Sequence, residues 1–500
     1  MWSRFSWNKQ YRSYSSSNGD DDAVSHTIFA PCTVGNLAVK RTWDMSLHQP
    51  SAVCVIRISG PDALPVLRDV TQDAGTFRPN SMYIRSLYRP TPASNTSELV
   101  DHNAMVVYFK GPRSFTGEDV VELHVHGGKA VVQDVMDRLM EFSHRIRPAE
   151  PGEFTKRAFL NGKMDLTQIE GLSDVLSSQT KTQKNMALAQ AMGMGTDLLN
   201  SWRQRLISCI ASVEAVIDFG EDDIEPEDVN KVLLESQRHA EILQQDIQRH
   251  IEAAPKSEIV KEGVRVVLIG PPNVGKSSLL NTMVGRSAAI VSPRAGTTRD
   301  ILEASIDVSG HKAIIQDGAG VRNSEWLEEA EGIARILAAA EKAHILLVVT
   351  AVDQPNIPFD EKLSRAIQNA SRVIYVRNKD DLHQGDFVSI QSRENQDFIP
   401  ISCHTGEGID TLIKTLEHHL ADTTQSSNLE GTVPPVLHRA RHIHHMRNAV
   451  RALQRFHRTD ALELAAEELR VAVAELGSVT GAVDVEDILD TIFNEFCIGK

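Results

Sequence analysis

The stretch Gly270-Pro-Pro-Asn-Val-Gly275-Lys276-Ser277 decides the fold of the middle of this chain. It follows Val264–Ile269, an almost wholly apolar run that is typical of a buried parallel strand, and it precedes Ser278–Val284, which has a helical pattern. A strand, a glycine-rich turn and a helix in this order form a P-loop, in which backbone N–H groups and the helix N-terminus surround phosphate oxygens. We therefore predict a nucleotide site in which Lys276 contacts the outer phosphates and the Ser277 hydroxyl ligates Mg²⁺.

Two further motifs complete the phosphate end of this site. Gly296-Thr-Thr-Arg-Asp300 offers a hydroxyl for Mg²⁺ and the γ-phosphate. Asp317-Gly-Ala-Gly320 follows the strand-like Lys312–Gln316, so its carboxylate should lie near the Mg²⁺ and its last N–H near the γ-phosphate. Each motif alone is also compatible with an ordinary loop, but their order at strand ends favours a GTPase.

Two more motifs select the base. Asn378-Lys-Asp-Asp381 follows the strand-like Arg372–Arg377, and the Asp381 carboxylate can accept two N–H donors of guanine, which adenine lacks. Ser402-Cys-His404 follows Phe398–Ile401 and matches the base-supporting loop of GTPases. The predicted GTP site comprises Asn273, Val274, Gly275, Lys276, Ser277, Ser278, Ser292, Pro293, Arg294, Ala295, Gly296, Thr297, Thr298, Asp317, Gly318, Ala319, Gly320, Asn378, Lys379, Asp381, Ser402, Cys403 and His404.

The site departs from the Ras-like pattern at the catalytic positions. The residue after Asp-x-x-Gly is Val321, which cannot orient water as glutamine does, and no arginine is obviously placed as a finger. Since an arginine finger contributes ~10³–10⁵ in rate, another cation must substitute. Asn273 and the loop Ser292–Thr298 are candidates for a monovalent cation site. Glu329, within the acidic stretch Glu325–Glu331, is a candidate to position water, although the pattern alone favours a solvated helix face.

Length and composition bound the rest of the chain. The 500 residues suggest about three domains at roughly 100–200 residues each. A net charge of −15 excludes a generally basic nucleic-acid-coating protein but not a local basic face. The five cysteines are scattered and odd in number, which argues against a disulfide framework. No apolar run approaches the ~20 residues of a membrane span.

The first residues differ from the others in composition. Met1–Gly19 contains three basic residues and six serines but no acid. This composition fits a transit peptide for the mitochondrial matrix, and the alternative is a disordered tail. We therefore exclude residues 1–25 from the expected fold.

Both flanks of the nucleotide-binding segment look helical. Before it, apolar residues recur at three and four positions at Leu199, Trp202, Leu206, Ile210, Val213 and Ile217. After the linker-like Thr423–Pro435, the same spacing recurs at Leu462, Ala465, Leu469, Ala472 and Leu476. Neither flank can bury its apolar stripe alone. We therefore expect one helical domain built from both flanks, with the nucleotide-binding domain inserted between them.

Several segments of the chain together resemble the MnmE (TrmE) family of tRNA-modification GTPases, in its mitochondrial form. The resemblance extends from about Thr27 to Lys500. It depends on Arg57-Ile-Ser-Gly60, on residues 114–128 and 147–166, and on the acidic helix break Ile217–Ile224. It depends also on the terminal Phe496-Cys-Ile-Gly-Lys500.

The resemblance implies a multidomain fold of α/β and all-α parts. An N-terminal α/β domain of folate-binding type would dimerise, and a discontinuous helical domain would carry an inserted Ras-like P-loop G domain. The expected boundaries are 26–148 for the N-terminal domain, 149–260 and 423–500 for the two helical parts with the linker, and 261–422 for the G domain.

The resemblance also assigns the catalytic ions. In the family, two G domains meet when K⁺ and GTP are bound, and K⁺ takes the place of an arginine finger. Glu329 falls on the family's catalytic glutamate, which orients the attacking water. Ser277 and Thr298 would ligate Mg²⁺. The implied K⁺ ligands are Asn273, Ser292, Arg294 and Thr297.

The family modifies C5 of the wobble uridine in certain tRNAs, together with an FAD-containing partner of the GidA (MnmG) type. A folate resembling 5-formyltetrahydrofolate supplies the one-carbon unit, and glycine or taurine supplies the amine. Cys497 matches a terminal cysteine needed for modification, but a buried structural thiol is an equal alternative. The implied folate contacts are Arg57, Glu122, Lys163 and Lys500.

Two departures from the family pattern stand out. Gly318 replaces the usual threonine of the Asp-Thr-Ala-Gly motif, which should leave a working but more flexible loop. Asn36–Gln49 interrupts the spacing near the N-terminus. It is either a real insertion that remodels a loop near the folate pocket or non-native sequence such as translated intron.

One local segment is basic. Residues 431–459 contain six Arg, five His and no acid, and Arg447, Arg451, Arg455 and Arg458 share one helix face. Such a face can contact RNA phosphates. The alternatives are a solvated face or arginines that pair with acids such as Glu221, Asp222 and Asp223.

Two rival functions remain open. A ribosome-assembly GTPase can share Asn273 and the missing glutamine, but it lacks the folate-type domain and the Cys-Ile-Gly-Lys ending. A GTP-switched scaffold would only order its flavoprotein partner and would perform no modification chemistry.

Overall fold

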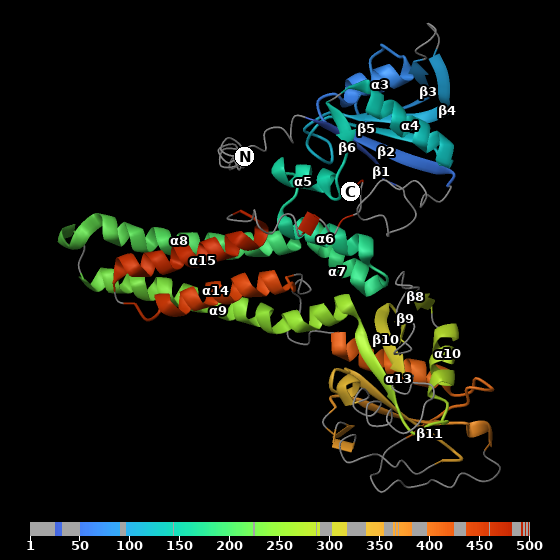
Figure 1. The fold of residues 1–500 in the computed structure, drawn as a ribbon. Coiled ribbons are helices and arrows are strands. Elements are labelled where there is room, and N and C mark those ends of the chain that lie inside the picture. Colours follow the sequence, from blue (N-terminus) through green and yellow to red (C-terminus); the bar gives the residue numbers. More distant parts are fainter. Residues whose placement is uncertain are drawn as a thin grey trace, which may run out of the picture. The chain divides into compact units, whose positions relative to one another are not determined.

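A computed structural model of the chain (Figure 1) describes residues 26–32, 51–90, 97–143, 145–223, 226–286, 288–290, 303–317, 337–354, 364–365, 367–368, 370–382, 398–424, 437–459, 461–482, 492–493, 496 and 499. Its contacts divide the chain into two compact units. Unit 1 comprises Met1–Ser173 and Gly477–Lys500, and unit 2 comprises Asp174–Leu476. Of the helices in the described ranges, none is long and apolar enough to cross a membrane. The segment Asn36–Gln49 and the leader lie outside these ranges.

Unit 1 contains a six-stranded sheet in the order β3-β4-β5-β2-β1-β6. Its strands pair antiparallel except β1 and β6, which run parallel. Two helices, α3 and α4, pack their apolar sides with the sheet in one buried cluster. The bounds are β1 (Thr27–Pro31), β2 (Val53–Ser59), α3 (Ala63–Thr71), β3 (Met82–Pro90), β4 (Ser97–Phe109), β5 (Val120–His126), α4 (Lys129–Phe142) and β6 (Ile146–Pro148).

The end of the chain returns to unit 1. Helix α5 (Glu153–Leu160) follows the sheet, and α6 (Leu166–Ser177) begins in the same unit. Phe493 and Phe496 are buried against Phe159 and Leu166 from these helices. At Gly152, which has φ +71°, a Cβ atom would lie 2.5 Å from the carbonyl oxygen of Phe493. This close approach requires glycine and seats the terminal segment beside α5.

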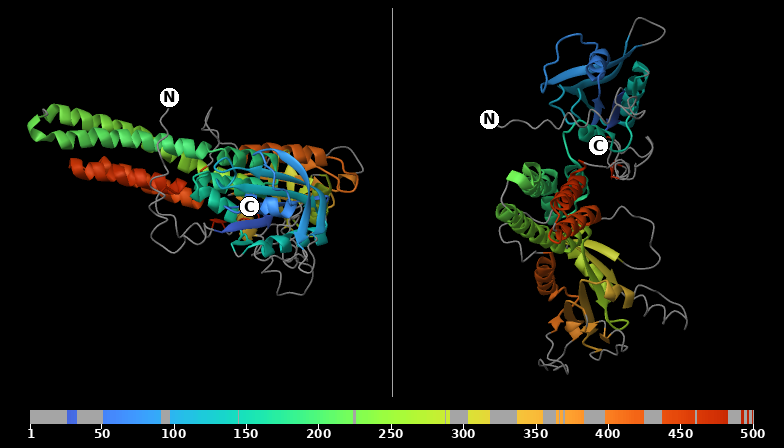
Figure 2. Two further views of the ribbon diagram at one scale, coloured as in Figure 1. Left: turned by 90° about the horizontal axis from the view of Figure 1, so that it is seen from above. Right: turned by 90° about the vertical axis from the view of Figure 1, so that its left-hand side faces the viewer.

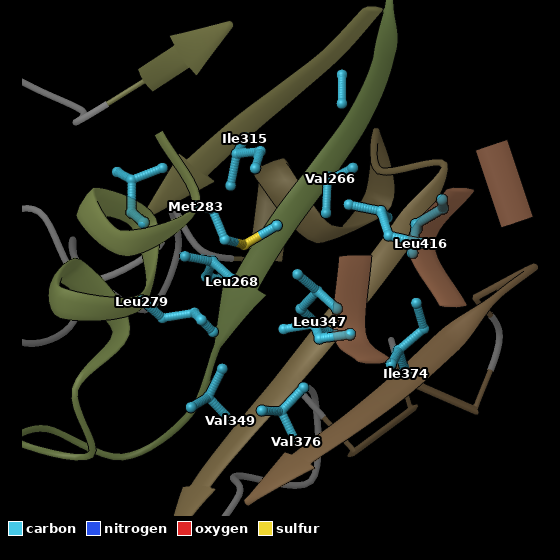
Figure 3. Packing of buried hydrophobic residues seen from close by; sticks show 14 of the residues in the cluster. Val266, Leu268, Leu279, Met283, Ile315, Leu347, Val349, Ile374, Val376 and Leu416 are labelled. Carbon is cyan, nitrogen blue, oxygen red and sulfur yellow. The ribbon is translucent and has the colours of Figure 1, made fainter. Parts of the chain in front are cut away.

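Unit 2 holds a seven-stranded sheet in the order β13-β12-β11-β7-β10-β9-β8. The five strands from β13 to β10 run parallel, and β9 and β8 extend the sheet antiparallel. Apolar side chains of α10 and α13 pack with the strands in one cluster (Figure 3). The bounds are β7 (Val264–Ile269), α10 (Lys276–Arg286), β8 (Ala288–Ile290), β9 (Glu303–Val308), β10 (His311–Asp317), β11 (Ile345–Ala351), β12 (Val373–Asn378), η2 (Asp380–Leu382), β13 (Ile399–Pro400) and α13 (Ile409–Thr424).

Long helices make up the rest of unit 2 (Figure 2). Helices α8 and α9 lie side by side, and α14, which follows the sheet in sequence, packs along α9, which precedes it. Helix α15 continues from unit 2 into unit 1. The bounds are α7 (Lys181–Ala191), α8 (Met194–Asp223), α9 (Pro226–Glu262), α14 (Ala440–Phe456) and α15 (Leu462–Thr480).

The apolar stripe predicted for α8 is only partly right. Leu199, Trp202, Leu206 and Val213 are buried as predicted. Ile210 and Ile217 were also predicted to be buried but are half-exposed, and their neighbours Cys209 and Val216 are buried instead. Because 3.6 residues per turn leave two neighbouring positions almost equally close to the core, spacing alone did not choose between them.

The carboxylate of Asp174 binds the two segments that connect the helices of unit 2 to its nucleotide-binding part. Its Oδ1 lies 2.9 Å from Lys261 Nζ and 3.0 Å from Arg439 Nη2. Lys261 is in the last turn of α9, just before the nucleotide-binding part (residues 264–424), and Arg439 is the N-cap of α14, just after it. The Asp174 side chain is only 9% exposed. A buried carboxylate costs desolvation free energy, and two cations offset that cost here.

Helix α7 also contacts the nucleotide-binding part. The Thr182 N–H donates to the carbonyl of Gly310 at 3.1 Å, in the turn between β9 and β10. Gln183 Nε2 donates to the carbonyls of Val260 and Lys261 at 3.2 and 2.8 Å. The start of α7 therefore touches both the end of α9 and the β9–β10 turn.

We predict that Asp174→Asn lowers local stability by about 2 kcal/mol at the joint where the end of α9 and the start of α14 meet Asp174. Breaking a buried ion pair costs about 3–5 kcal/mol, and the partial exposure of Lys261 reduces this value. Amide hydrogen exchange in the last turn of α9 and the first turn of α14 measures the loss. The matched control is Asp246→Asn, which removes exposed ion pairs to Arg205 and Arg249 and should cost less than about 1 kcal/mol. Equal effects of the two variants would contradict the prediction.

Acid should weaken the same joint. Burial lowers the pKa of His438 to about 4, from the usual 6.5, and its Nε2 lies 3.9 Å from Asp174 Oδ2. At a pH between these two pKa values, the unfolded chain holds a proton on His438 that the folded chain lacks. The free energy of unfolding therefore falls as the pH falls. The expected loss from this residue is about 2 kcal/mol between pH 7.5 and 5. Unfolding of His438→Asn should show a shallower pH slope, and an unchanged slope would argue against this assignment.

Candidate functional site

The P-loop lies between β7 and α10 and requires its unusual residues. At Gly275, which has φ +94°, a Cβ atom would lie 2.3 Å from Nδ2 of Asn378, so only glycine lets these two segments meet. Asn273 has φ +64°, a conformation that asparagine adopts more readily than most residues. The Asn378 amide donates to the carbonyl of Val274 at 2.8 Å and ties β12 to the loop.

The side chain of Lys276 folds over the P-loop. Its ammonium donates to the carbonyls of Gly270 and Pro271 at 2.8 and 2.7 Å. The residue is 5% exposed, and burial lowers its pKa although Asp317 partly opposes that shift. A buried cation whose hydrogen bonds in the described residues go to neutral carbonyls is well suited to exchange them for charged phosphate oxygens.

Two predicted Mg²⁺-associated groups lie together. The Ser277 hydroxyl donates to Oδ2 of Asp317 at 2.5 Å, and Asp317 ends β10 beside β7. Hard oxygens of this kind suit Mg²⁺, which usually takes one or two protein ligands together with substrate phosphates. Within the described part of the chain, no three His, Cys, Asp or Glu side chains are grouped to hold a metal ion by themselves. The residues therefore fit a metal that arrives with a nucleotide.

The base end of the site is assembled from β12 and the loop after β13. Ser402 Oγ donates to Oδ1 of Asp381 at 2.6 Å and fixes the carboxylate that was predicted to read guanine. The same Oγ accepts from the N–H of His404 at 3.2 Å. The Cys403 N–H donates to Oδ1 of Asn378 at 3.2 Å, and burial raises the pKa of the Cys403 thiol. The predicted base-recognition residues thus meet in one place.

Two supporting contacts were missed from the sequence. Arg286, at the end of α10, donates to the carbonyl of Gly406 at 2.9 Å and pairs with Asp410 at 2.7 Å. It thereby fixes the loop that carries Ser402. Lys379 pairs with Asp353 at 2.8 Å, just after β11. Neither pairing has a local sequence signature, because the partners are far apart in the chain.

Some predicted residues lie outside the described ranges. These comprise the loop Ser292–Thr298, the residues Gly318–Gly320, the water-positioning candidate Glu329 and the terminal residues Cys497 and Lys500. Their roles stay predictions.

Two further predicted residues, Arg57 and Glu122, meet in unit 1. Arg57 on β2 donates to Oε1 of Glu122 on β5 from Nε and Nη2 at 3.0 and 2.9 Å. The Arg57 guanidinium also lies 5.2 Å from the ring centre of Phe115 and 5.8 Å from that of Phe154. Lys163 lies on the surface and donates to the carbonyl of Pro112 at 2.9 Å. A partly exposed arginine, carboxylate and aromatic ring can recognise a planar polar heterocycle, while Phe154 is fully buried behind the arginine.

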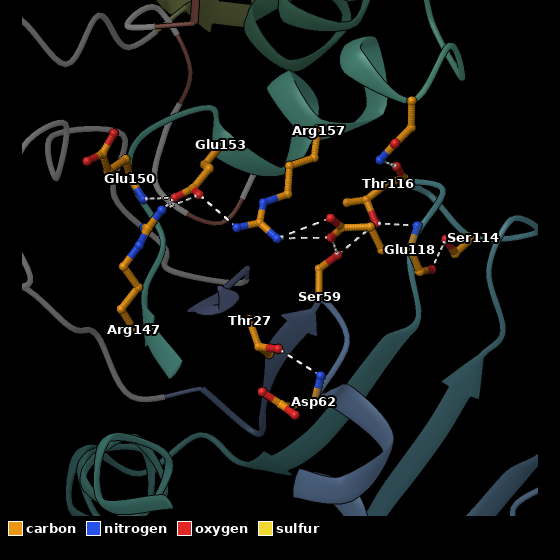
Figure 4. Close-up of polar contacts among 11 residues, drawn as sticks. Thr27, Ser59, Asp62, Ser114, Thr116, Glu118, Arg147, Glu150, Glu153 and Arg157 are labelled. Carbon is orange, nitrogen blue, oxygen red and sulfur yellow. Dashed lines mark hydrogen bonds and ion pairs between the residues drawn. The ribbon is translucent and has the colours of Figure 1, made fainter. Parts of the chain in front are cut away.

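A buried ionic network supports this group (Figure 4). Arg157 of α5 is 4% exposed and pairs with Glu118 at 3.0 Å and Glu153 at 3.1 Å. Ser59, two residues after Arg57, donates to Glu118 at 2.7 Å. The network therefore joins strand β2, the loop before β5 and helix α5, and the sequence reading did not single out Arg157 or Glu118.

The order and geometry of the phosphate and base motifs define unit 2 as carrying a P-loop GTPase site. The anchors are Lys276 and Ser277 at the phosphate end and Asp381 with Ser402 at the base end.

Comparison with known proteins supplies the family. A model described as the MnmE helical domain matches residues 166–497, and a model described as the GTP-binding protein TrmE N-terminus matches residues 45–163. The chain belongs to the MnmE/TrmE family. This finding confirms the resemblance that was inferred from the motifs.

Individual relatives align along most of the chain. The tRNA modification GTPase MnmE of Wolbachia sp. subsp. Brugia malayi is 40% identical over 90% of this chain and 96% of its own. The mitochondrial 5-taurinomethyluridine-[tRNA] synthase subunit GTPB3 of Danio rerio is 38% identical over 90% of both chains. Among solved structures, Aquifex aeolicus Era bound to GDP·AlF4⁻ matches 31% of this chain and 57% of its own at 26% identity, with a TM-score of 0.24.

We predict that Asp381→Asn weakens GTP binding by about 100-fold or more, because the guanine N–H donors lose a charged acceptor. Xanthosine triphosphate, whose C2 carbonyl accepts a hydrogen bond, should bind this variant better than GTP. Titration with fluorescent nucleotides measures both affinities. Asp380→Asn is the matched control, because Asp380 pairs with Arg377 at 3.0 Å, and it should keep GTP affinity within about twofold. A control that loses GTP binding equally would point to general damage.

Proposed function

We propose that this protein is a K⁺-stimulated GTPase that modifies C5 of the wobble uridine in mitochondrial tRNAs, together with a flavoprotein partner. The observation that carries the proposal is a GTP site assembled in a chain that aligns over 90% of its length with a tRNA modification GTPase. The FAD belongs to the partner, which would be of the GidA (MnmG) type.

The product is either a carboxymethylaminomethyl or a taurinomethyl group. The name of the fish relative, a mitochondrial 5-taurinomethyluridine synthase subunit, supports the second choice and a mitochondrial location. The basic, serine-rich leader supports the matrix as the compartment. The bacterial relative is equally similar, so glycine remains the alternative amine donor.

The residues of the GTP site would divide the work of hydrolysis. Lys276 would bind the outer phosphates and Asp381 the base, while Ser277 and Thr298 would hold Mg²⁺. Glu329 would orient the attacking water in place of the missing glutamine. Bound K⁺ would supply the positive charge that an arginine finger supplies elsewhere. Its proposed ligands are Asn273, Ser292, Arg294 and Thr297.

The residues of unit 1 would bind the folate, which supplies the one-carbon unit. Glu122 can accept N–H donors of a pterin ring, and Arg57 holds that carboxylate in place. Lys163 and Lys500 would face the anionic end of the folate. Cys497, three residues from the chain end, would place a thiol near the reacting carbon. By analogy with the family, the protein would act as a homodimer.

We predict that Cys497→Ser abolishes the modified nucleoside while GTP turnover continues, because a serine hydroxyl is a far weaker nucleophile than a thiolate. Mass spectrometry of mitochondrial tRNA nucleosides from the variant, the wild type and a null strain checks this outcome. The control is Cys32→Ser, because Cys32 Sγ donates to the carbonyl of Gly499 at 3.2 Å and a hydroxyl can keep that bond.

Other outcomes separate the rival functions. Modification that persists in Cys497→Ser but is lost with GTP binding would favour the GTP-switched scaffold. Normal modification in the null strain, with defective ribosomal subunits, would favour a ribosome-assembly GTPase.

A further inference from the structure

Helix α14 carries a row of arginines that point away from the core. Its buried side comprises His442, Met446, Ala449, Val450, Ala452, Leu453 and Phe456. Arg447 and Arg451 lie four residues apart and share the opposite side, and Arg458 follows seven residues later in the turn after the helix. All three are exposed.

The neighbouring helix α15 is acidic, and two of its carboxylates bind groups of α14. Glu468 accepts from Arg455 Nε at 2.7 Å, and Glu475 accepts from His445 at 2.8 Å and from Asn448 at 3.1 Å. Arg455 therefore joins α14 to α15, which corrects its assignment to the open basic face. Arg451 donates to Asn448 within its own helix at 2.9 Å.

We infer that Arg447, Arg451 and Arg458 form a docking surface for the sugar–phosphate backbone of the tRNA substrate. This inference depends on the proposed function for the identity of the RNA. Arginine binds phosphate through paired N–H donors and keeps its charge at any physiological pH. Arg447 and Arg451 lie on a helix whose opposite side is buried, and Arg458 lies in the turn directly after it.

The composition of the surface favours RNA over an acidic protein. A protein interface usually has an apolar or aromatic centre. Along Ala440–Phe456 no large apolar side chain is exposed, and the segment 431–459 contains no acid. A phosphate backbone needs only the charge and the donors that this side offers. The overall charge of −15 makes such a local surface necessary for any anionic partner.

The test compares the full-length protein with the triple variant R447Q/R451Q/R458Q in binding to labelled tRNA over a series of KCl concentrations. We expect at least a tenfold loss of affinity at low salt. The slope of log K against log salt should fall by about 2–3, since each lost phosphate contact removes about 0.7–0.9. GTP turnover without tRNA should not change, because none of the three residues is near the nucleotide site.

The matched control is R89Q/R249Q/R470Q, which changes net charge equally at arginines that are paired with Glu141, Asp246 and Glu214. Its affinity and salt slope should resemble those of the wild type. An unchanged slope in the R447Q/R451Q/R458Q variant, or an equal loss in the control, would overturn the inference. Intact tRNA binding with lost binding of the flavoprotein partner would instead make this side a protein interface. Wild-type protein that binds no tRNA at all would overturn the inference and leave the proposed function standing, because the partner could then bind the tRNA; loss of the modified nucleoside in a null strain tests that function separately.

Discussion

The ion cluster around the Asp174 carboxylate is the constraint on which the arrangement of unit 2 depends. The chain leaves the helices after Lys261 and returns to them by Arg439, and one carboxylate binds both residues. Apart from this tie, α9 and α14 are held together by the packing of their buried sides and by the folded part of the chain between them. The buried sides of α9 and α14 are complementary, but apolar contact is not directional. The ion cluster is directional, and it fixes the position at which α14 begins beside the end of α9.

The same logic of buried ionic groups recurs in unit 1. Arg157 links Glu118 and Glu153 in a site that is almost closed to solvent. Removing Arg157 would leave two largely buried carboxylates with fewer partners, Ser59 for Glu118 and Arg147 for Glu153, so the network favours one arrangement of its segments. Arg57 and Glu122, by contrast, are about a fifth exposed and face each other across paired strands. A rigid support beneath a partly open pair is the arrangement that ligand-binding groups require.

The sequence predicted those parts of the site whose chemistry is local. Lys276, Ser277 and Asp381 could be assigned because phosphate and guanine recognition need fixed residue types at the ends of strands, and strand ends are visible in the hydrophobic pattern. Arg286 and Asp174 could not be assigned, because their partners lie far along the chain and a single long-range ion pair leaves no periodic trace. Helical spacing located the apolar stripe of α8 but not its exact residues, and it grouped Arg455 with arginines whose surroundings differ.

Strand β10 links the nucleotide site to helix α7. At one end it adjoins Gly310, whose carbonyl is bound by the first turn of α7, and at the other it ends in Asp317 beside Ser277. Hydrogen bonds to β7 and β9 on its two sides make it stiff along its length. A displacement of Asp317 would therefore be transmitted along β10 to the turn at Gly310, which the start of α7 contacts. Helix α7, which supplies no residue to the nucleotide site, is thereby linked to Asp317 through one strand and its hydrogen bonds.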